Sequence, residues 1–512
     1  MQRTTAEQRL YALWAECREL QASEDLLHWD QETYMPERGH AGRAKVMATL
    51  AGLKHRRLSS PEMQEALATC AEMADERSLL AAQVRCARYE VDRAVRVPER
   101  LAREIAEAKS AGLVAWERAR AEADFALFRP ALERQVRLRR EEAAAIRPDG
   151  NAYDALLDYW EPGATEAELR PLFARLREEL SLLVRAVVES GVEVDESPAR
   201  GHFPGDRQVA LGRRMAEAIG FNFAAGRLDR STHPFCIGPH REDVRLTYRF
   251  QEHDFRPCLF GILHEAGHGL YEQGLAAEWQ RTPIGDAVSM VIHESQSRLW
   301  ENHVGRSRGF WRWALPHFRN AFPGTPEPDV DFLWPAFHTV KPSLIRTEAD
   351  EATYNLHIVV RFEIEADLIA GRIEAGDLPA IWDDLYDQLL GIRPPDAAQG
   401  VLQDIHWGQG SFGYFPTYTL GNLAAAQLFA AAERELGDPE EAFAAGEFGP
   451  LLDWLRTRVH THGGRYTAGE LIARVTGKPL APDDLLDHLR QTAEQAYRST
   501  RGMVKCRLKA YM

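Results

Sequence analysis

The sequence predicts a mainly α-helical protein with very little sheet, and three observations favour this fold class. Near the N-terminus, Leu10, Trp14 and Cys17 recur at the spacing of one helical face. Residues 98–146 are dense in Ala, Glu, Arg and Leu, which are good helix formers. Strand-like alternation is rare and is clearest at residues 243–250. We therefore expect helices to supply most of the core.

The domain organisation follows from three Pro- and Gly-rich breaks, at residues 193–207, 227–241 and 321–330. None of them has the composition of a flexible linker. Although a chain of 512 residues is long enough for several domains, we expect a single domain over residues 1–512.

The bulk composition argues against several classes of partner. The formal net charge is −15, so a phosphate backbone or an anionic membrane surface would be repelled. The N-terminus lacks the apolar core of a secretory signal, and no apolar run reaches the roughly 18 residues that span a bilayer. The six cysteines are scattered without a C-x-x-C pair, which favours reduced thiols in a cytoplasmic protein.

The predicted strand carries a candidate substrate-binding residue. Asp243, Arg245 and Thr247 alternate with apolar residues and so share one face of the strand. A strand edge here could bind an extended peptide through its backbone, with Arg245 beside it. The three side chains could equally form a structural face held by a salt bridge, and the sequence leaves both readings open.

The most specific motif is HEAGH at residues 264–268. His264 and His268 are four residues apart, so on a helix both rings lie on one face and can reach one metal ion. Glu265 is rotated about 100° from that face, where it can reach a water on the metal and act as general base. Gly267 and Gly269 are poor helix formers, and we interpret them as leaving room for a substrate.

A catalytic zinc ion usually takes three protein ligands and one open position. Glu272 lies a further turn along, but three ligands on one straight helix cannot close round a tetrahedral ion. The next helical pattern, residues 289–302, offers His293 or Glu294 at the start of a returning helix. Spacing alone does not decide between these two residues.

The motifs together resemble those of the carboxypeptidase Taq family of zinc metallocarboxypeptidases. The resemblance spans nearly the whole chain, except for the tail after about Thr500. In order, its motifs are WDQET-x-MP (29–36), HPF (233–235), D-x-R-x-T (243–247), HEAGH (264–268), HESQ (293–296), I-R-x-x-A-D (345–350) and G-x-x-Q-D-x-H-W (400–407).

This resemblance implies a large helical fold with a deep substrate groove and a very small sheet, similar to neurolysin and angiotensin-converting enzyme. The N-terminal helices, about residues 1–125, would then form a lid over the groove. It implies a homodimer that removes single C-terminal residues from peptides with a free C-terminus, with broad preference except for Pro. It also implies one Zn²⁺ per chain, which Co²⁺ can replace, with Glu294 as third ligand and His293 as a neighbouring or substrate-side group.

The ligand glutamate has an unusual neighbour. In angiotensin-converting enzyme the residue four positions after that glutamate is an acid that orients a zinc histidine, whereas this chain has Arg298 there. Another acceptor must hold the imidazole in this protein, and the sequence does not name it.

Two further groups complete the predicted active site. A C-terminal carboxylate needs a fixed cation, and the resemblance favours Arg346, with Asp350 placed to hold its guanidinium. Alternatively, Arg346 forms a purely structural ion pair with Asp350 or Glu348. Donors that stabilise the oxyanion are expected from the Gly-rich stretch 403–418, where the candidates are His406, Tyr414 and Tyr418.

Two other functions fit parts of this pattern. An oligopeptidase would cleave internal bonds with the same chemistry but without a carboxylate clamp. A non-catalytic protein with structural zinc would usually show four ligands rich in cysteine, which this sequence lacks.

Overall fold

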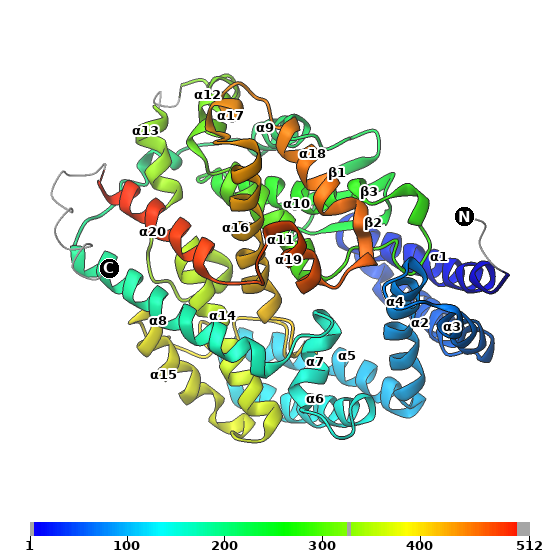
Figure 1. Ribbon diagram of the computed structural model, residues 1–512. Coiled ribbons are helices and arrows are strands. Elements are labelled where there is room, and N and C mark those ends of the chain that lie inside the picture. Colours follow the sequence, from blue (N-terminus) through cyan, green and yellow to red (C-terminus); the bar gives the residue numbers. More distant parts are fainter. Residues whose placement is uncertain (1–4, 325–328, 499–512) are drawn as a thin grey trace. The chain divides into compact units, whose positions relative to one another are not determined.

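Helices make up most of the described structure, as the sequence predicts (Figure 1). The computed structural model describes residues 5–324 and 329–498. The tail after about Thr500, which the family resemblance does not cover, lies outside these residues. The α-helices are Thr5–Thr33 (α1), His40–Leu58 (α2), Pro61–Met73 (α3), Leu79–Arg96 (α4), Glu99–Glu122 (α5), Phe125–Ile146 (α6), Ala152–Trp160 (α7), Glu166–Ser190 (α8), Gly205–Ala218 (α9), Arg256–Gly274 (α10), Met290–Arg298 (α11), Arg308–Ala321 (α12), Val330–Leu333 (α13), Glu351–Ala370 (α14), Leu378–Leu390 (α15), Pro416–Leu436 (α16), Glu440–Ala444 (α17), Gly449–Arg458 (α18), Ala468–Thr476 (α19) and Asp483–Arg498 (α20).

The Ala- and Glu-rich stretch from residue 98 forms two helices, α5 and α6. Ala123 adopts the left-handed conformation at φ 52° and ends α5. Asp124 then caps α6 by accepting a hydrogen bond from the amide of Ala126 at 2.9 Å. A capped break of this kind lets two helices pack against each other.

The chain divides into two compact units, each assembled from three stretches of sequence. Unit 1 comprises Met1–Val95, Glu196–Phe337 and Ala424–Leu480, and unit 2 comprises Arg96–Asp195, His338–Leu423 and Ala481–Met512. The helices predicted to form a lid, about residues 1–125, are therefore divided between the two units. The single domain and the lid remain predictions.

The sheet belongs to unit 1 and has three strands: β1 (Gly226–Arg230), β2 (Cys236–His240) and β3 (Asp243–Tyr248). The predicted strand forms, with Val244 and Leu246 fully buried. Of the two readings that the sequence left open, the peptide-binding sheet edge is excluded, because the strand order is β1-β3-β2, with β1 parallel and β2 antiparallel to β3. Since β3 is paired on both sides, an extended peptide cannot add to its backbone.

The N-terminal motif packs on this sheet. Trp29 of α1 lies under two guanidinium groups, those of Arg227 and Arg245, at 4.7 and 4.2 Å from its ring centroid. Next to it, the ring of His28 lies 5.5 Å from that of Phe235 in the HPF motif. Motifs more than 190 residues apart in the sequence thus meet as packing partners around β1 and β3.

Helix α10 runs through the core of unit 1. Leu259, Ile262, Leu263 and Leu270 on this helix are fully buried, and α10 packs against α9, α11, β2 and β3. Burying such apolar side chains is the main stabilising contribution to a helix in a folded protein. The motif helix therefore has a rigid support.

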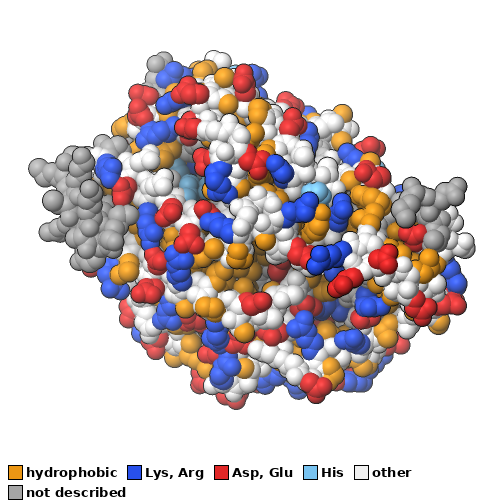
Figure 2. All heavy atoms as spheres, in the orientation of Figure 1, with side chains coloured by type: hydrophobic (Ala, Val, Ile, Leu, Met, Phe, Trp, Pro, Cys, Tyr) orange, Lys and Arg blue, Asp and Glu red, His pale blue; other side chains and the backbone are white. Residues whose placement is uncertain are grey.

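On the face drawn in Figure 2, acidic and basic side chains are interspersed, with apolar side chains scattered between them. Within residues 5–324 and 329–498, no helix is both long enough and apolar enough to span a bilayer.

Candidate active site

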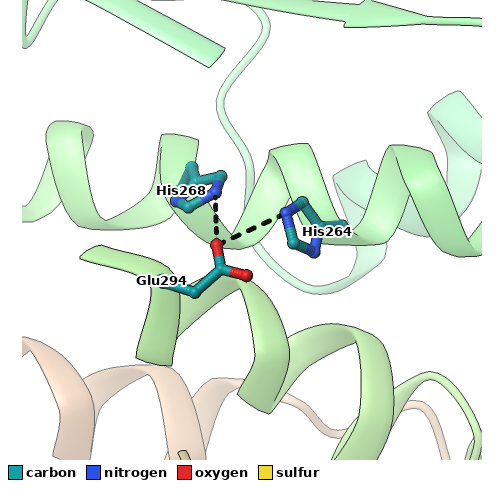
Figure 3. Close-up of side chains that lie close together, drawn as sticks. All are labelled: His264, His268 and Glu294. Carbon is teal, nitrogen blue, oxygen red and sulfur yellow. Dashed lines mark ion pairs between the residues drawn. The ribbon is translucent and has the colours of Figure 1, made fainter. Parts of the chain in front are cut away.

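The two motif histidines lie on one face of α10, as the sequence predicts (Figure 3). The ring centroids of His264 and His268 are 4.9 Å apart and the rings are nearly perpendicular. Both side chains are mostly buried, with exposed fractions of 17% and 15%. Burial lowers the pKa of His268 to about 3, which keeps its ring in the neutral form that binds metals.

Close packing of α11 against α10 brings Glu294 next to His264 and His268. Ser289 begins α11 by capping the amide of Ile292 at 3.2 Å. A Cβ atom on Gly267 would lie 2.6 Å from the carbonyl oxygen of Gln296 and 2.7 Å from Cα of Ser297. Our interpretation of Gly267 as room for substrate is therefore wrong, because this glycine allows α11 to approach α10.

Gly269 has a similar packing reason. A Cβ atom there would lie 2.5 Å from the ring of Phe221 and 2.9 Å from the side chain of Leu246 on β3. Neither glycine opens space beside the histidines, so both serve the packing of α10 against its neighbours.

Glu294 points at both histidines, and Figure 3 shows the three side chains converging. Its Oε2 lies 3.6 Å from Nε2 of His264 and 3.3 Å from Nε2 of His268. A tetrahedral zinc ion with ligands at about 2.0–2.1 Å separates neighbouring ligand atoms by about 3.3–3.4 Å. Both N···O distances are therefore close to this spacing, and the group offers the N, N, O chemistry that suits a divalent metal ion.

The charge state of Glu294 also suits a ligand. Burial opposes its negative charge, but Arg298 and the two histidines outweigh burial and hold the pKa of Glu294 well below its usual range. Among the residues that the structure describes, His264, His268 and Glu294 are the one group of three such side chains with this geometry.

Glu265 lies beside this group with an unused oxygen. Its side chain is buried, and Oε2 has no hydrogen-bond partner among the described residues. Burial raises the pKa of Glu265 to about 7. A buried carboxylate with one unpaired oxygen and a pKa near neutrality fits a proton carrier next to a metal site.

Glu301 is the acceptor beside His264 that the sequence could not name. Its Oε2 lies 2.9 Å from Nδ1 of His264, the ring nitrogen that faces away from Glu294. Glu301 belongs to a π-helical turn, Leu299–Val304, that continues α11. Arg298 donates to Glu294 at 2.7 Å and to Glu301 at 3.3 Å, and so links the two carboxylates.

His293, predicted as a neighbouring or substrate-side group, lies behind His268. Its Nδ1 is 2.6 Å from Nδ1 of His268, and its Nε2 is 2.7 Å from Oε1 of Glu272. Both ring nitrogens are thus engaged within the protein, which argues against a contact with substrate.

The three predicted oxyanion donors meet in unit 2. The rings of His406 and Tyr414 stack with centroids 5.4 Å apart, and the hydroxyl of Tyr418 lies 3.4 Å from Nε2 of His406. The buried carboxylate of Glu365 holds the loop that carries them by accepting hydrogen bonds from Trp407 Nε1 at 2.8 Å and from an amide of the loop, that of Gly413, at 2.9 Å.

Arg346 pairs with Asp404 and with neither predicted partner. Its Nε and Nη2 donate to Asp404 at 3.1 and 2.8 Å, and Nη1 donates to the hydroxyl of Tyr354 at 2.9 Å. Asp350 instead caps α14 through the amides of residues 352 and 353. Arg361, which the sequence analysis missed, also donates to Asp404, at 2.7 Å. The two guanidinium groups outweigh burial and hold the pKa of Asp404 far below its usual range.

Arg245 forms the salt bridge that the sequence left open. Its guanidinium donates to both carboxylate oxygens of Asp243, at 2.9 and 3.0 Å. Together with its position over Trp29, this contact favours the structural reading of the strand face.

A helical protein with two histidines one turn apart, a glutamate beside the first and a second glutamate from the next helix has the arrangement of a metallopeptidase centre. The comparisons agree with this class. The model of the carboxypeptidase Taq (M32) metallopeptidase family matches residues 9–493. The chain therefore belongs to this family, and it is a metallocarboxypeptidase.

Its relatives match over most of their length. Thermostable carboxypeptidase 1 of Thermus thermophilus is 45% identical over 484 residues, which cover 92% of this chain and 95% of that protein. Carboxypeptidase 1 of Bacillus subtilis is 37% identical over 477 residues, with 92% and 95% covered. The crystal structure of an M32 carboxypeptidase from Deinococcus radiodurans is 38% identical, covers 96% of this chain and 100% of its own, and superposes with a TM-score of 0.93.

Proposed function

We propose that this protein is a zinc-dependent carboxypeptidase that removes single C-terminal residues from peptides, with broad preference except for Pro. The observation that carries the proposal is the position of Glu294 Oε2, 3.6 Å from Nε2 of His264 and 3.3 Å from Nε2 of His268, which fits ligands that share one ion. These three residues would hold the zinc ion, one per chain, and Co²⁺ would be able to replace it.

When bound, the metal supplies a Lewis acid that lowers the pKa of a water molecule and polarises the scissile carbonyl. Glu265 would accept a proton from the attacking water and later deliver it to the leaving amine. The free, buried Oε2 of Glu265 supports this assignment, since no other described group competes for it. Its pKa near 7 suits both acceptance and release of a proton.

Arg346 is our proposed clamp for the substrate carboxylate. Arginine has five N–H groups, and one each from Nε, Nη1 and Nη2 is engaged with Asp404 or Tyr354. One N–H on each terminal nitrogen is left to pair with a carboxylate. Asp404 then serves to fix the guanidinium of Arg346. Because Arg361 pairs with the same carboxylate, the three groups carry a net charge of about +1, which suits an anionic substrate group.

His406, Tyr414 and Tyr418 are the proposed donors to the oxyanion. Burial lowers the pKa of His406 to about 3, so its ring is neutral and carries one N–H. Their mutual ring contacts supply the preorganisation that oxyanion stabilisation requires. Arg245, with its salt bridge to Asp243, is a weaker candidate for substrate contact.

The wider setting follows from the family and the composition. We propose a cytoplasmic homodimer that acts on peptides with a free C-terminus and has neither nucleic acid nor membrane as a partner. The net charge of −15 and the mixed charges on the face in Figure 2 support the last point.

A peptide digest followed by mass spectrometry tests the function. We expect a ladder of single C-terminal losses, which a chelator abolishes and added Zn²⁺ restores. Internal fragments would instead show an oligopeptidase, and a protein that binds zinc but leaves the peptide intact would show a structural metal site.

A further inference from the structure

The two metal histidines are held in different ways. Nδ1 of His264 faces the carboxylate of Glu301 directly. Nδ1 of His268 lies 2.6 Å from another imidazole nitrogen, Nδ1 of His293. The carboxylate of Glu272 contacts the opposite side of the His293 ring, at Nε2. Two imidazole nitrogens at this distance must share one proton, so one of them donates and the other accepts.

The metal geometry decides the direction of this hydrogen bond. Nε2 of His268 points at Glu294 and must be unprotonated to bind an ion. A neutral imidazole carries one N–H, so the proton of His268 is on Nδ1, which donates to His293. In the reverse arrangement His293 would donate, and a neutral His268 would carry its proton on Nε2, where it blocks the metal.

The same argument assigns the direction of the hydrogen bond between His293 and Glu272. If Nδ1 of His293 accepts, its own proton is on Nε2, 2.7 Å from Oε1 of Glu272, and that carboxylate accepts it. Glu272 lies one turn beyond His268 on α10, and Gly238 of β2 packs against it so closely that a Cβ there would be 2.9 Å from Oε2. The carboxylate is thereby confined beside the ring that it must hold.

We propose that His293 and Glu272 are positioning residues that fix the tautomer and orientation of His268 through a two-step hydrogen-bond relay. This inference rests on the proposed metal site and adds a requirement to it. The relay makes metal affinity depend on an acceptor at the position of His293 Nδ1, and on an anion behind it. An acceptor of this kind typically changes metal affinity by 10–100-fold.

Matched substitutions test the relay. His293→Leu removes the acceptor, whereas His293→Asn places an oxygen near the position of Nδ1. Glu272→Leu removes the anion, whereas Glu272→Gln keeps an oxygen that can accept. The Zn²⁺ dissociation constant is measured by competition with a chelator of known affinity, and the visible spectrum of the Co²⁺ form reports the ligand geometry.

We expect both Leu variants to bind Zn²⁺ 10–100-fold more weakly than the wild type and to shift the Co²⁺ spectrum. His293→Asn restores the acceptor but does not reach Glu272, so it should bind Zn²⁺ more tightly than His293→Leu and more weakly than the wild type, while Glu272→Gln should lose less affinity than Glu272→Leu. Unchanged affinity in both Leu variants, or equal losses in the Leu and Asn variants of His293, would overturn the relay. If His293→Leu fails to fold, the Zn²⁺ dissociation constants of His293→Asn and of the two Glu272 variants still test the relay. A wild type that binds no Zn²⁺ would instead overturn the metal site, and the relay with it.

Discussion

Gly267 of α10 lies directly against Ser297 of α11, with room for a hydrogen but none for a methyl group between the two backbones. The contact sets the distance between the helix that carries both histidines and the helix that carries Glu294. A single glycine thus links helix packing to the geometry of the proposed metal ligands.

Replacing Gly267 with alanine should therefore weaken metal binding although residue 267 is not a ligand. A Cβ 2.7 Å from Ser297 Cα forces α11 outward, which moves Glu294 away from the histidines and destabilises the fold by about 1–3 kcal/mol. We expect the Zn²⁺ dissociation constant, measured by chelator competition, to rise at least tenfold.

Gly261 on the same helix is the matched control, since a Cβ there meets nothing within 4 Å. Gly261→Ala should keep metal affinity and raise stability by up to about 1 kcal/mol through helix propensity. Equal metal affinity in the two variants would show that the helix contact does not set the ligand geometry.

Glu265→Gln should separate catalysis from metal binding. The amide keeps the size of the side chain but cannot accept the proton, so kcat should fall by about 10²–10⁴-fold. Metal content, measured by elemental analysis, should stay at the wild-type value because Glu265 is not a ligand. A variant that retains more than a tenth of wild-type kcat would contradict the assignment of Glu265 as general base.

Arg346→Ala should abolish the preference for a free C-terminus. The measurement compares kcat/KM for a peptide with a free carboxylate and for the same peptide with a C-terminal amide. The wild type should favour the carboxylate strongly, and the variant should lose about 2–5 kcal/mol of that preference, as expected when one partner of a buried charge pair is removed.

Arg361→Ala provides the comparison, because Arg361 also pairs with Asp404 but is fully buried. Arg361→Ala should mainly lower stability, measured as the urea midpoint of unfolding. It should have little effect on the ratio of kcat/KM for the free-carboxylate peptide to that for the amidated peptide. If Arg346→Ala leaves that ratio at the wild-type value, Arg346 is a structural residue.

Glu365 should make stability depend on pH. Burial raises its pKa from the ordinary 4.5 to about 7 in the folded state, so the folded protein holds a proton that the unfolded chain releases. Stability from this group is fully present below pH 4.5 and is lost as the pH rises through 7, on the order of 3 kcal/mol.

The side chain in Glu365→Gln cannot titrate, so this variant should lack the pH-dependent stability that Glu365 contributes. Urea midpoints at pH 4.5 and pH 7.5 should show the wild type losing stability relative to the variant as the pH rises. A stability difference between the two proteins that is the same at both pH values would contradict a raised pKa for Glu365.

The local parts of the site were predictable because they depend on helical spacing. His264 and His268 are one turn apart, so any helix brings them together. Glu301 carried a usable signal as well, since it lies seven residues after Glu294 and close to the same helical face. The choice between His293 and Glu294 depended on the rotation of α11, which spacing across the intervening loop does not fix.

Other contacts depend on how distant segments pack, and the sequence alone could not supply them. Asp404 pairs with Arg346 from 58 positions away, while the nearer acid Asp350 is used as a helix cap. The role of Gly267 was also missed, because a glycine beside a site and a glycine between two helices look alike in a sequence. The mainly α class was predictable, whereas two units interleaved from six stretches were not.

The claim that His264, His268 and Glu294 bind one metal ion is tested most directly by X-ray diffraction from crystals of the Zn²⁺-loaded protein. Data collected just above and just below the zinc absorption edge locate the ion without reference to activity. We predict one strong anomalous peak per chain, about 2.0–2.1 Å from Nε2 of each histidine and from Oε2 of Glu294. A peak elsewhere, or none between these three atoms in protein that holds stoichiometric zinc, would contradict the assignment.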